Sequence, residues 1–273
     1  MKRINATRKV LLMASSIILL LLSGLIAPVL AANPSTDDSL EKVLRAGKLT
    51  IGIDDAYPPM EFRDPNNNLV GFDIDLAREI GKRLGVKVEW IPTEWNGVLL
   101  ALNAHKFDII LSTLSVTEER AKVIDFGPPY LYESQVIVVR AKDNKIKSKE
   151  DLAGKVVGTQ LGSTSEEAAR TVKGIKELKK YNKFTEVFLD LGIGRLDAGV
   201  VDELVGRYYM TERPDDFKVV ASIRDEPVAI GYRKQDKKLQ EAINKIVEEI
   251  KADGTMAKIS QKWFGTDITA KKK

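Results

Sequence analysis

The sequence predicts an α/β protein with two lobes, each made of a sheet covered by helices. Short apolar strand patterns alternate with amphipathic helix patterns along most of the chain, and such alternation implies crossover connections and mostly parallel sheets. The same order of elements occurs twice, and long strand patterns lie where the chain would leave the first half and return to it. We therefore expect two hinge strands between the lobes.

The first 31 residues are interpreted as a signal peptide. A basic stretch, MKRINATRK, precedes an apolar run and the small residues VLAA, so cleavage is expected after Ala31. A retained anchor is the alternative, since about 20 apolar residues can span a bilayer, but Gly24 and Pro28 interrupt the run. We expect secretion across the cytoplasmic membrane, to the periplasm or the cell-envelope space.

Charge and cysteine content exclude several classes of protein. The four charged residues before Ala31 are all basic and equal the formal net charge of +4, so the processed chain is nearly neutral. It lacks the excess positive charge that phosphate backbones attract, and no nucleic-acid partner is expected. The chain has no cysteine, which excludes disulfides and thiol chemistry. We expect a monomer with no metal and no cofactor.

The first half follows a polar leader at 32–39 and carries three helix and three strand patterns. Leu49, Ile51 and Ile53 alternate before Asp54, and Gly85 stands where a helix C-cap belongs. Helices are expected over 39–48, 72–85 and 94–106, and strands over 48–54, 86–92 and 107–113. The segment 54–71 is expected to form a loop, because Pro58, Pro59, Pro65 and Gly71 mark turns in it.

The second half repeats this order. Strands are expected over 155–160 and 195–202, helices over 163–173 and 203–210, connecting strands over 130–141 and 224–234, and closing helices over 239–265 with a break at Gly254. The resulting domains are lobe 1 at 40–133 plus 227–265, lobe 2 at 134–226 and a basic tail at 266–273. The hinges are expected at 133–136 and 224–228.

Four predicted strand ends carry polar side chains. In open α/β sheets, ligands bind outside the carboxyl ends of the strands. Each signal alone has an ordinary explanation: Arg120 would be a solvated helix residue, and Asp202 would cap its helix. Their coincidence predicts a shared cleft lined by residues from both halves, which are Asp54, Thr113, Ser115, Arg120, Gln160, Thr164 and Asp202.

The chemistry of this set fits an amino acid. Arg120 offers a forked donor for a carboxylate, helix starts after Ser115 and Thr164 offer backbone N–H groups for an anion, and Asp202 offers a partner for an ammonium group. Asp54 remains for the ligand's side chain. The aromatic residues Tyr57 and Trp95 lie next to these loops and could stack on a planar or cationic group.

Six motifs carry a resemblance to a known family. They are YPPMEF, VGFDIDLAREIGKRLG, SVTEERAKVIDF, DLAGKVVGTQLGST, GRLDAGVVDE and KADGTMAKISQKWFG. Across about 40–265 the chain resembles the family 3 solute-binding proteins of bacterial ABC importers for amino acids. The resemblance implies a periplasmic-binding-protein type II-like fold that closes on its ligand. It also implies a membrane permease and a cytoplasmic ATPase as partners.

The same resemblance assigns roles to residues. It places the carboxylate contact on Arg120, the ammonium contact on Asp202, hydroxyl contacts on Thr113, Ser115 and Thr164, the acidic side-chain contact on Asp54 and the aromatic pair on Tyr57 and Trp95. Leu161 departs from some glutamine-binding relatives, which carry a lysine at that position, and this removes a positive charge from the pocket.

The acidic residue Asp54 makes arginine or lysine the leading ligand. An aliphatic side chain would leave a buried carboxylate unpaired, at several kcal/mol. Glutamine, histidine and cystine stay open, because amides and ammonium groups also donate to a carboxylate. Glu61 is interpreted as structural rather than as a ligand contact.

Two other classes of protein, enzymes and receptors, are alternatives to a binding protein. Cyclohexadienyl dehydratases on the same fold need a general acid in the cleft, whereas His105, the one histidine, lies in a predicted surface loop. A Glu or Asp could still act as the acid, so the sequence does not forbid catalysis. A lytic transglycosylase or a receptor would need a further domain or span, and only the short TDITAKKK follows Gly265. No P-loop motif is present. We therefore expect a binding protein rather than an enzyme.

Overall fold

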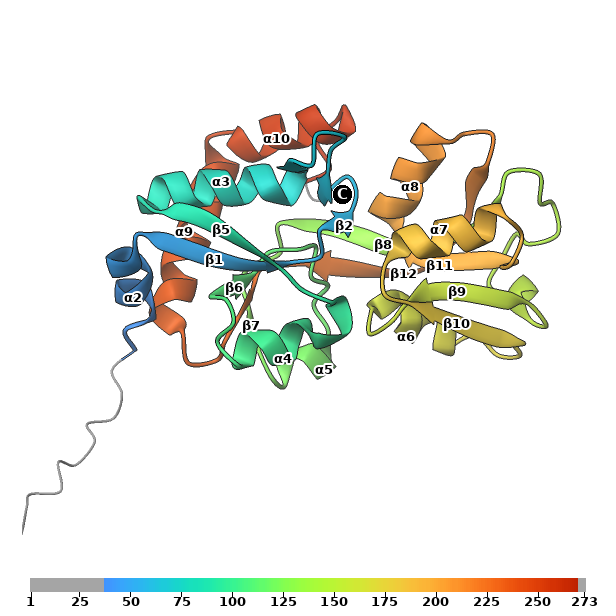
Figure 1. The fold of residues 1–273 in the computed structure, drawn as a ribbon, viewed down its shortest axis with the longest axis horizontal. Coiled ribbons are helices and arrows are strands. Elements are labelled where there is room, and N and C mark those ends of the chain that lie inside the picture. Colours follow the sequence, from blue (N-terminus) through green and yellow to red (C-terminus); the bar gives the residue numbers. More distant parts are fainter. Residues whose placement is uncertain (1–36, 270–273) are drawn as a thin grey trace, which may run out of the picture. The chain divides into compact units, whose positions relative to one another are not determined.

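The computed structural model describes residues 37–269, so the predicted signal peptide, most of the leader and the end of the basic tail lie outside the described residues. Two five-stranded sheets form the framework of this part of the chain (Figure 1). One contains strands from 48–126 together with 231–232, and the other contains strands from 131–228. The two-lobed α/β fold is therefore confirmed.

The first sheet has the order β5-β1-β6-β13-β7. Its strands are β5 (Lys87–Pro92), β1 (Lys48–Ile53), β6 (Ile109–Ile110), β13 (Gly231–Tyr232) and β7 (Asp125–Phe126). β1 runs parallel to β5 and β6, whereas β13 runs antiparallel to β6 and β7. Helix α3 (Phe72–Leu84) lies on one side of β1 and helix α4 (Val98–Asn103) on the other (Figure 1).

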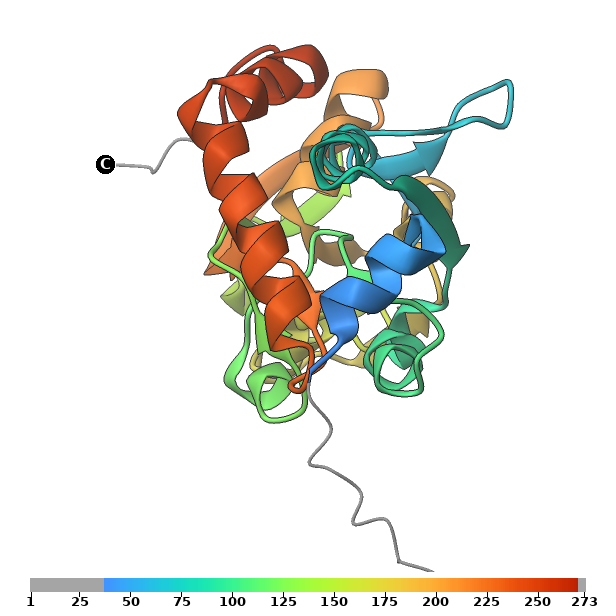
Figure 2. The same cartoon turned by 90° about the vertical axis from the view of Figure 1, so that its left-hand side faces the viewer.

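Further helices complete this lobe. They are α2 (Ser39–Ala46), the 3-10 helix η1 (Trp95–Gly97), α5 (Glu118–Ala121), α9 (Lys237–Ala252) and α10 (Thr255–Phe264), and a small sheet is formed by β2 (Ala56–Tyr57), β3 (Glu61–Arg63) and β4 (Leu69–Val70). Helix α2 lies beside α9 (Figure 2), where the Ser39 hydroxyl accepts a hydrogen bond from the backbone of Leu239. The C-terminal helices therefore return to the first sheet.

The second sheet has the order β10-β9-β11-β8-β12. Its strands are β10 (Glu177–Tyr181), β9 (Val156–Gln160), β11 (Ala198–Asp202), β8 (Leu131–Arg140) and β12 (Phe217–Val228), and its helices are η2 (Glu150–Leu152), α6 (Thr164–Arg170), α7 (Phe184–Gly192) and α8 (Glu203–Glu212). β8 and β12 form an antiparallel ladder that places Glu133 opposite Glu226. The chain enters this lobe along β8 and leaves it along β12.

Four details of the expected elements were wrong. The segment 54–71, expected to be a loop, contains the short strands β2, β3 and β4. The predicted strand at 107–113 is only β6, because Ser112 and Thr113 bond to the buried acids Glu61 and Asp73 instead of a neighbouring strand. The sheets are mixed rather than mostly parallel, since β8, β12 and β13 pair antiparallel. Strand β10 and helix α7 were missed.

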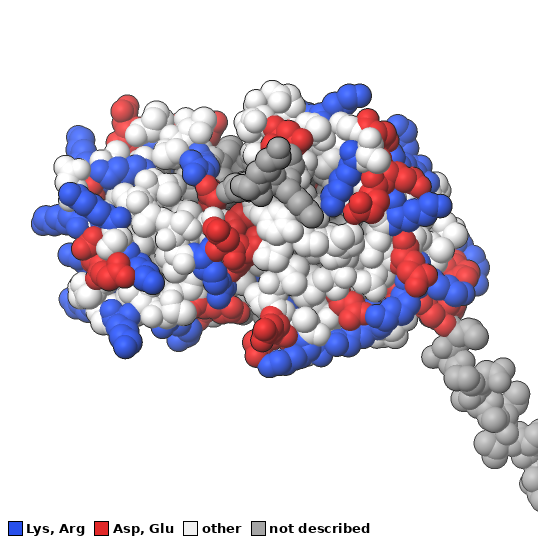
Figure 3. Space-filling view, turned by 180° about the vertical axis from the view of Figure 1, so that it is seen from behind, with Lys and Arg blue, Asp and Glu red and all other residues white. Residues whose placement is uncertain are grey.

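The expected helix at 72–85 is confirmed. Ile74, Ala77, Ile80 and Gly81 are buried on one face, and Gly85 adopts the left-handed conformation (φ 77°) that ends the helix. No helix within 37–269 is long and apolar enough to cross a membrane. On the face shown in Figure 3, acidic and basic side chains of the described residues are interspersed, in keeping with the balance of acidic and basic residues after Ala31.

Candidate functional site

The predicted site residues meet where the two sheets face each other. Tyr57 donates a hydrogen bond of 2.5 Å to Asp202, and the amide of Gln160 donates one of 2.6 Å to Asp54. Each of these bonds joins one lobe to the other. Ser115 and Thr164 make a third such contact at 3.3 Å. Strand ends 145 and 106 residues apart in sequence therefore form one cluster.

Arg120 is buried although it sits in the short helix α5. Thr117 caps the start of this helix, and its side chain accepts a hydrogen bond from the backbone N–H of Arg120. The guanidinium of Arg120 donates to the backbone oxygens of Ser115 (2.9 Å) and Gly162 (3.5 Å). It lies 5.6 Å from the centre of the Trp95 ring. Burial lowers the pKa of Arg120, yet arginine remains charged in proteins. A buried cation bonded to carbonyls is well placed to bind a carboxylate.

Asp202 supplies the opposite charge from the second lobe. It ends β11 and stands at the N-cap of α8, yet its side chain does not cap that helix. Instead it accepts hydrogen bonds from Tyr57 and from the hydroxyl of Ser165 at 2.9 Å. Burial raises the pKa of Asp202, and these hydrogen bonds oppose the rise. A buried acid held by hydroxyls can receive an ammonium group.

Asp54 is engaged more fully than the sequence indicated. One carboxylate oxygen accepts from Gln160, and the other accepts from the backbone of Ala56 (3.1 Å) and from the ammonium of Lys183 (3.0 Å). Lys183 was not predicted as a site residue, because β10 and α7, which it connects, were missed. The spacing of Phe184, Val187, Phe188 and Leu191, all buried on α7, was the signal that could have found it.

Two buried acids support the loop that carries Thr113. Thr113 has a φ of +46°, and both its backbone N–H (2.7 Å) and its hydroxyl (3.0 Å) donate to Asp73. Tyr130 donates to the same oxygen at 3.0 Å, and Ser112 donates to Glu61. Burial raises the pKa of Asp73 to about 6 and that of Glu61 well above its ordinary value. Glu61 thus has structural contacts.

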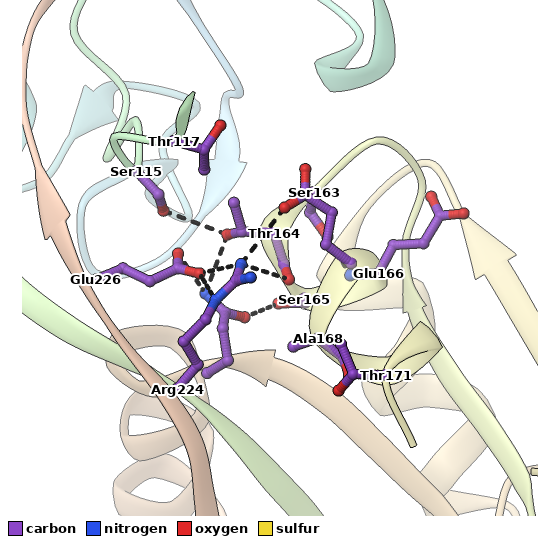
Figure 4. Close-up of polar contacts among 12 residues, drawn as sticks. Ser115, Thr117, Ser163, Thr164, Ser165, Glu166, Ala168, Thr171, Arg224 and Glu226 are labelled. Atoms are coloured by element: carbon purple, nitrogen blue, oxygen red, sulfur yellow. Dashed lines mark hydrogen bonds and ion pairs between the residues drawn. The ribbon is translucent and has the colours of Figure 1, made fainter. Parts of the chain in front are cut away.

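Thr164 links this cluster to the paired strands β8 and β12 (Figure 4). Its hydroxyl accepts from the amide of Gln135 at 3.1 Å, and its carbonyl accepts from Arg224 at 3.5 Å. Gln135 and Arg224 both also donate to Glu226, at 3.1 and 2.7 Å. The segments expected to act as hinges therefore contact the start of α6 directly.

The space between these side chains is small. A cavity of about 10 Å³ is lined by Asp54, Tyr57, Trp95, Ser112, Thr113, Gln160 and Asp202. This volume is close to what one water molecule needs, so an amino acid would fit only after the lobes move apart. The hydrogen bonds between the lobes are the contacts that a ligand would replace or extend.

Residues 49–266 match the bacterial extracellular solute-binding proteins, family 3. The chain belongs to this family. Among related solute-binding proteins, the L-cystine-binding protein TcyJ of Escherichia coli (strain K12) is 32% identical over 256 residues, covering 91% of this chain and 96% of the relative. The arginine-binding extracellular protein ArtP of Bacillus subtilis (strain 168) is 32% identical over 253 residues, covering 90% and 97%.

Solved structures of solute-binding proteins are also similar. An ancestral arginine-binding protein bound to arginine is 45% identical, with a TM-score of 0.78, and the match covers 80% of this chain and 99% of that one. The ancestral amino acid-binding protein AncCDT-1, described as a precursor of cyclohexadienyl dehydratase, is 40% identical with a TM-score of 0.79, covering 83% and 99%. These likenesses support the two-lobed fold of this solute-binding protein.

Proposed function

We propose that this solute-binding protein captures a polar L-amino acid between its lobes and delivers it to an ABC permease driven by a cytoplasmic ATPase. The relatives above are named for cystine and arginine binding. The place of action would be the periplasm or cell-envelope space, and the protein would act as a monomer.

One observation carries this proposal: opposite charges are buried on facing lobes. Arg120 is 7% exposed and Asp202 is 6% exposed, and each is held by neutral groups of the other described residues rather than by an ion pair. A zwitterion would satisfy both, with its carboxylate on Arg120 and its ammonium on Asp202. Such a ligand contacts both lobes, so it favours the closed form over the open one.

The side chain of the ligand would extend toward Asp54. Arginine or lysine is the leading candidate, because Asp54 is a buried carboxylate and a similar solved structure holds arginine. The aromatic rings of Tyr57 and Trp95 border the same cavity. Glutamine, histidine and cystine are the alternatives, and relatives named for cystine and histidine binding are similar to this chain.

An enzyme is the second candidate function, and the likeness to AncCDT-1 favours it. Against it, His105 is exposed in the loop after α4, away from the cavity. Asp202 also suits an ammonium group, which prephenate does not carry; arogenate does carry one, so this point counts against prephenate alone. We therefore propose that the chain does not catalyse a reaction.

Isothermal titration calorimetry of the processed protein tests the proposal. Arginine, lysine, glutamine, histidine and cystine would be titrated separately, and the protein would be incubated with prephenate and arogenate. Saturable binding of at least one amino acid at micromolar or lower concentration, without product formation, supports a transport role. Turnover of prephenate or arogenate would assign the chain to the dehydratases, and absence of binding to every amino acid would contradict the proposal.

A further inference from the structure

The acid at the side-chain end of the site is already paired with a cation from the opposite lobe. Lys183 Nζ lies 3.0 Å from Asp54 Oδ1 and 3.7 Å from Glu94 Oε1. Asp54 directly follows β1 in the first lobe, whereas Lys183 directly precedes α7 in the second. The pair therefore bridges the lobes at the place where a ligand's side chain would arrive.

This ion pair is shielded from solvent. The Asp54 side chain is 2% exposed and that of Lys183 is 19% exposed, so water and salt screen the pair far less than a surface pair. Burial opposes the charged form of Lys183, but the attraction and hydrogen bond of Asp54 outweigh it, and the pKa of Lys183 is raised. Lys183 is therefore positively charged at neutral pH.

The pair changes what Asp54 can offer to a ligand. Both of its oxygens already accept hydrogen bonds, from Gln160 on one side and from Ala56 and Lys183 on the other. A ligand's guanidinium or ammonium would have to displace Lys183 or lie beside it, with two cations sharing one carboxylate. Lys183 could shift toward Glu94, but that carboxylate is 56% exposed and so is a weaker partner.

A side chain without net charge avoids this competition. A carboxamide can donate to Asp54 and accept from Lys183 at the same time. A second amino-acid head group can do the same, with its ammonium toward Asp54 and its carboxylate toward Lys183. Such groups would keep both charges partnered in the ligand-bound form.

We propose that Lys183 is a specificity-determining residue, which competes with cationic ligand side chains for Asp54 and so reduces the preference of the site for arginine or lysine over polar side chains of zero net charge. The inference rests on the proposed amino-acid binding. If Lys183 competes in this way, arginine binds less tightly than it would bind to the same site without Lys183.

Calorimetry on the charge-removing variant Lys183→Met tests this. The ligands are arginine and whichever of glutamine and cystine the unaltered protein binds more tightly. We expect the affinity for arginine to rise at least tenfold relative to the net-neutral ligand. Lys176→Met, which removes an exposed lysine of the same lobe, is the matched control and should change neither affinity more than twofold. Lys183→Gln replaces Lys183→Met if that variant does not fold.

A second variant tests the same competition by changing Glu94, the other carboxylate near Lys183. Glu94→Gln removes the alternative partner of Lys183, so arginine should bind more weakly while the net-neutral ligand is unaffected. If Lys183→Met and Lys183→Gln change both ligands by the same factor, or lower the relative affinity for arginine, this inference is wrong. If the unaltered protein binds no amino acid, the proposed function itself fails.

Discussion

At the scale of single residues, the backbone of Thr113 shows how hydrogen bonds to a buried acid hold the site in place. A φ of +46° is unusual for a β-branched residue, and it is maintained by two hydrogen bonds to Asp73. Asp73 is fully buried, as is the neighbouring Glu61. Strained positions of this kind persist only when their surroundings hold them firmly.

The burial of Asp73 predicts a pH dependence of stability. The pKa of Asp73 is about 6 in the folded protein and 3.8 ordinarily. As the pH falls, the folded protein therefore binds this proton before the unfolded chain does. The free energy of unfolding should therefore fall as the pH rises from about 4 to about 6, because the buried carboxylate must then be charged. Asp73→Asn should remove up to about 3 kcal/mol of this dependence.

Urea denaturation of both proteins between pH 4 and pH 7 measures this effect. The stability of Asp73→Asn relative to the unaltered protein should increase with pH across that window. A constant difference would mean that Asp73 has an ordinary pKa, and a decreasing difference would mean that its carboxylate is favoured by folding.

At the scale of elements, the turn into α3 is fixed by Gly71. This residue has a φ of +139°, and an added Cβ would lie 2.0 Å from the backbone oxygen of Met60. The same oxygen accepts a hydrogen bond from the backbone of Asp73. The start of α3 is thus held against the turn between β2 and β3. This contact also fixes Asp73, whose carboxylate bonds to Thr113.

Gly71→Ala should therefore destabilise the protein strongly, by roughly 3 kcal/mol or more. Gly47→Ala is the matched control. Gly47 also has a positive φ of 64°, but nothing lies within 4 Å of its added Cβ, so only the backbone strain of about 1–2 kcal/mol is expected. Equal losses for the two variants in denaturant unfolding would show that crowding against Met60 is not the cause.

Sequence patterns predicted most elements because burial on one face dictates periodicity. Helix α3 and strand β1 match their predicted positions closely. Strand β10 was missed because its sequence, ELKKY, alternates weakly and its residues are only partly buried or exposed. With β10 and α7 the position of Lys183 was missed as well.

At the scale of the whole molecule, the residues of the candidate site were predictable but their pairing was not. The strand ends were predictable as candidate ligand positions because the parallel strands of this fold class end at one edge of the sheet. The bonds Tyr57 to Asp202 and Lys183 to Asp54 depend on how the lobes meet. No local pattern determines that arrangement, so the sequence does not show that Asp54 is already paired with Lys183.

The small cavity between the lobes predicts a change of shape on binding. An amino acid can enter only when the lobes separate, so we expect open forms in the ligand-free protein. A ligand that contacts both lobes favours the closed form over the open one, so saturating ligand should lower the mean radius of gyration in small-angle X-ray scattering. Tyr57→Phe, which removes one bond between the lobes, should raise the radius of the ligand-free protein. An unchanged radius in both experiments would argue against hinge closure.

The central claim is that Arg120 holds the carboxylate of an amino acid, and a thermodynamic cycle tests it most directly. Calorimetry would compare arginine, or the tightest-binding amino acid, with its decarboxylated amine, in the unaltered protein and in Arg120→Ala. The amine should bind the unaltered protein at least a hundredfold more weakly than the amino acid, a loss of about 3 kcal/mol. In Arg120→Ala that difference should largely disappear. If the amine binds the unaltered protein as tightly as the amino acid does, or if the difference persists in full without Arg120, the account is contradicted.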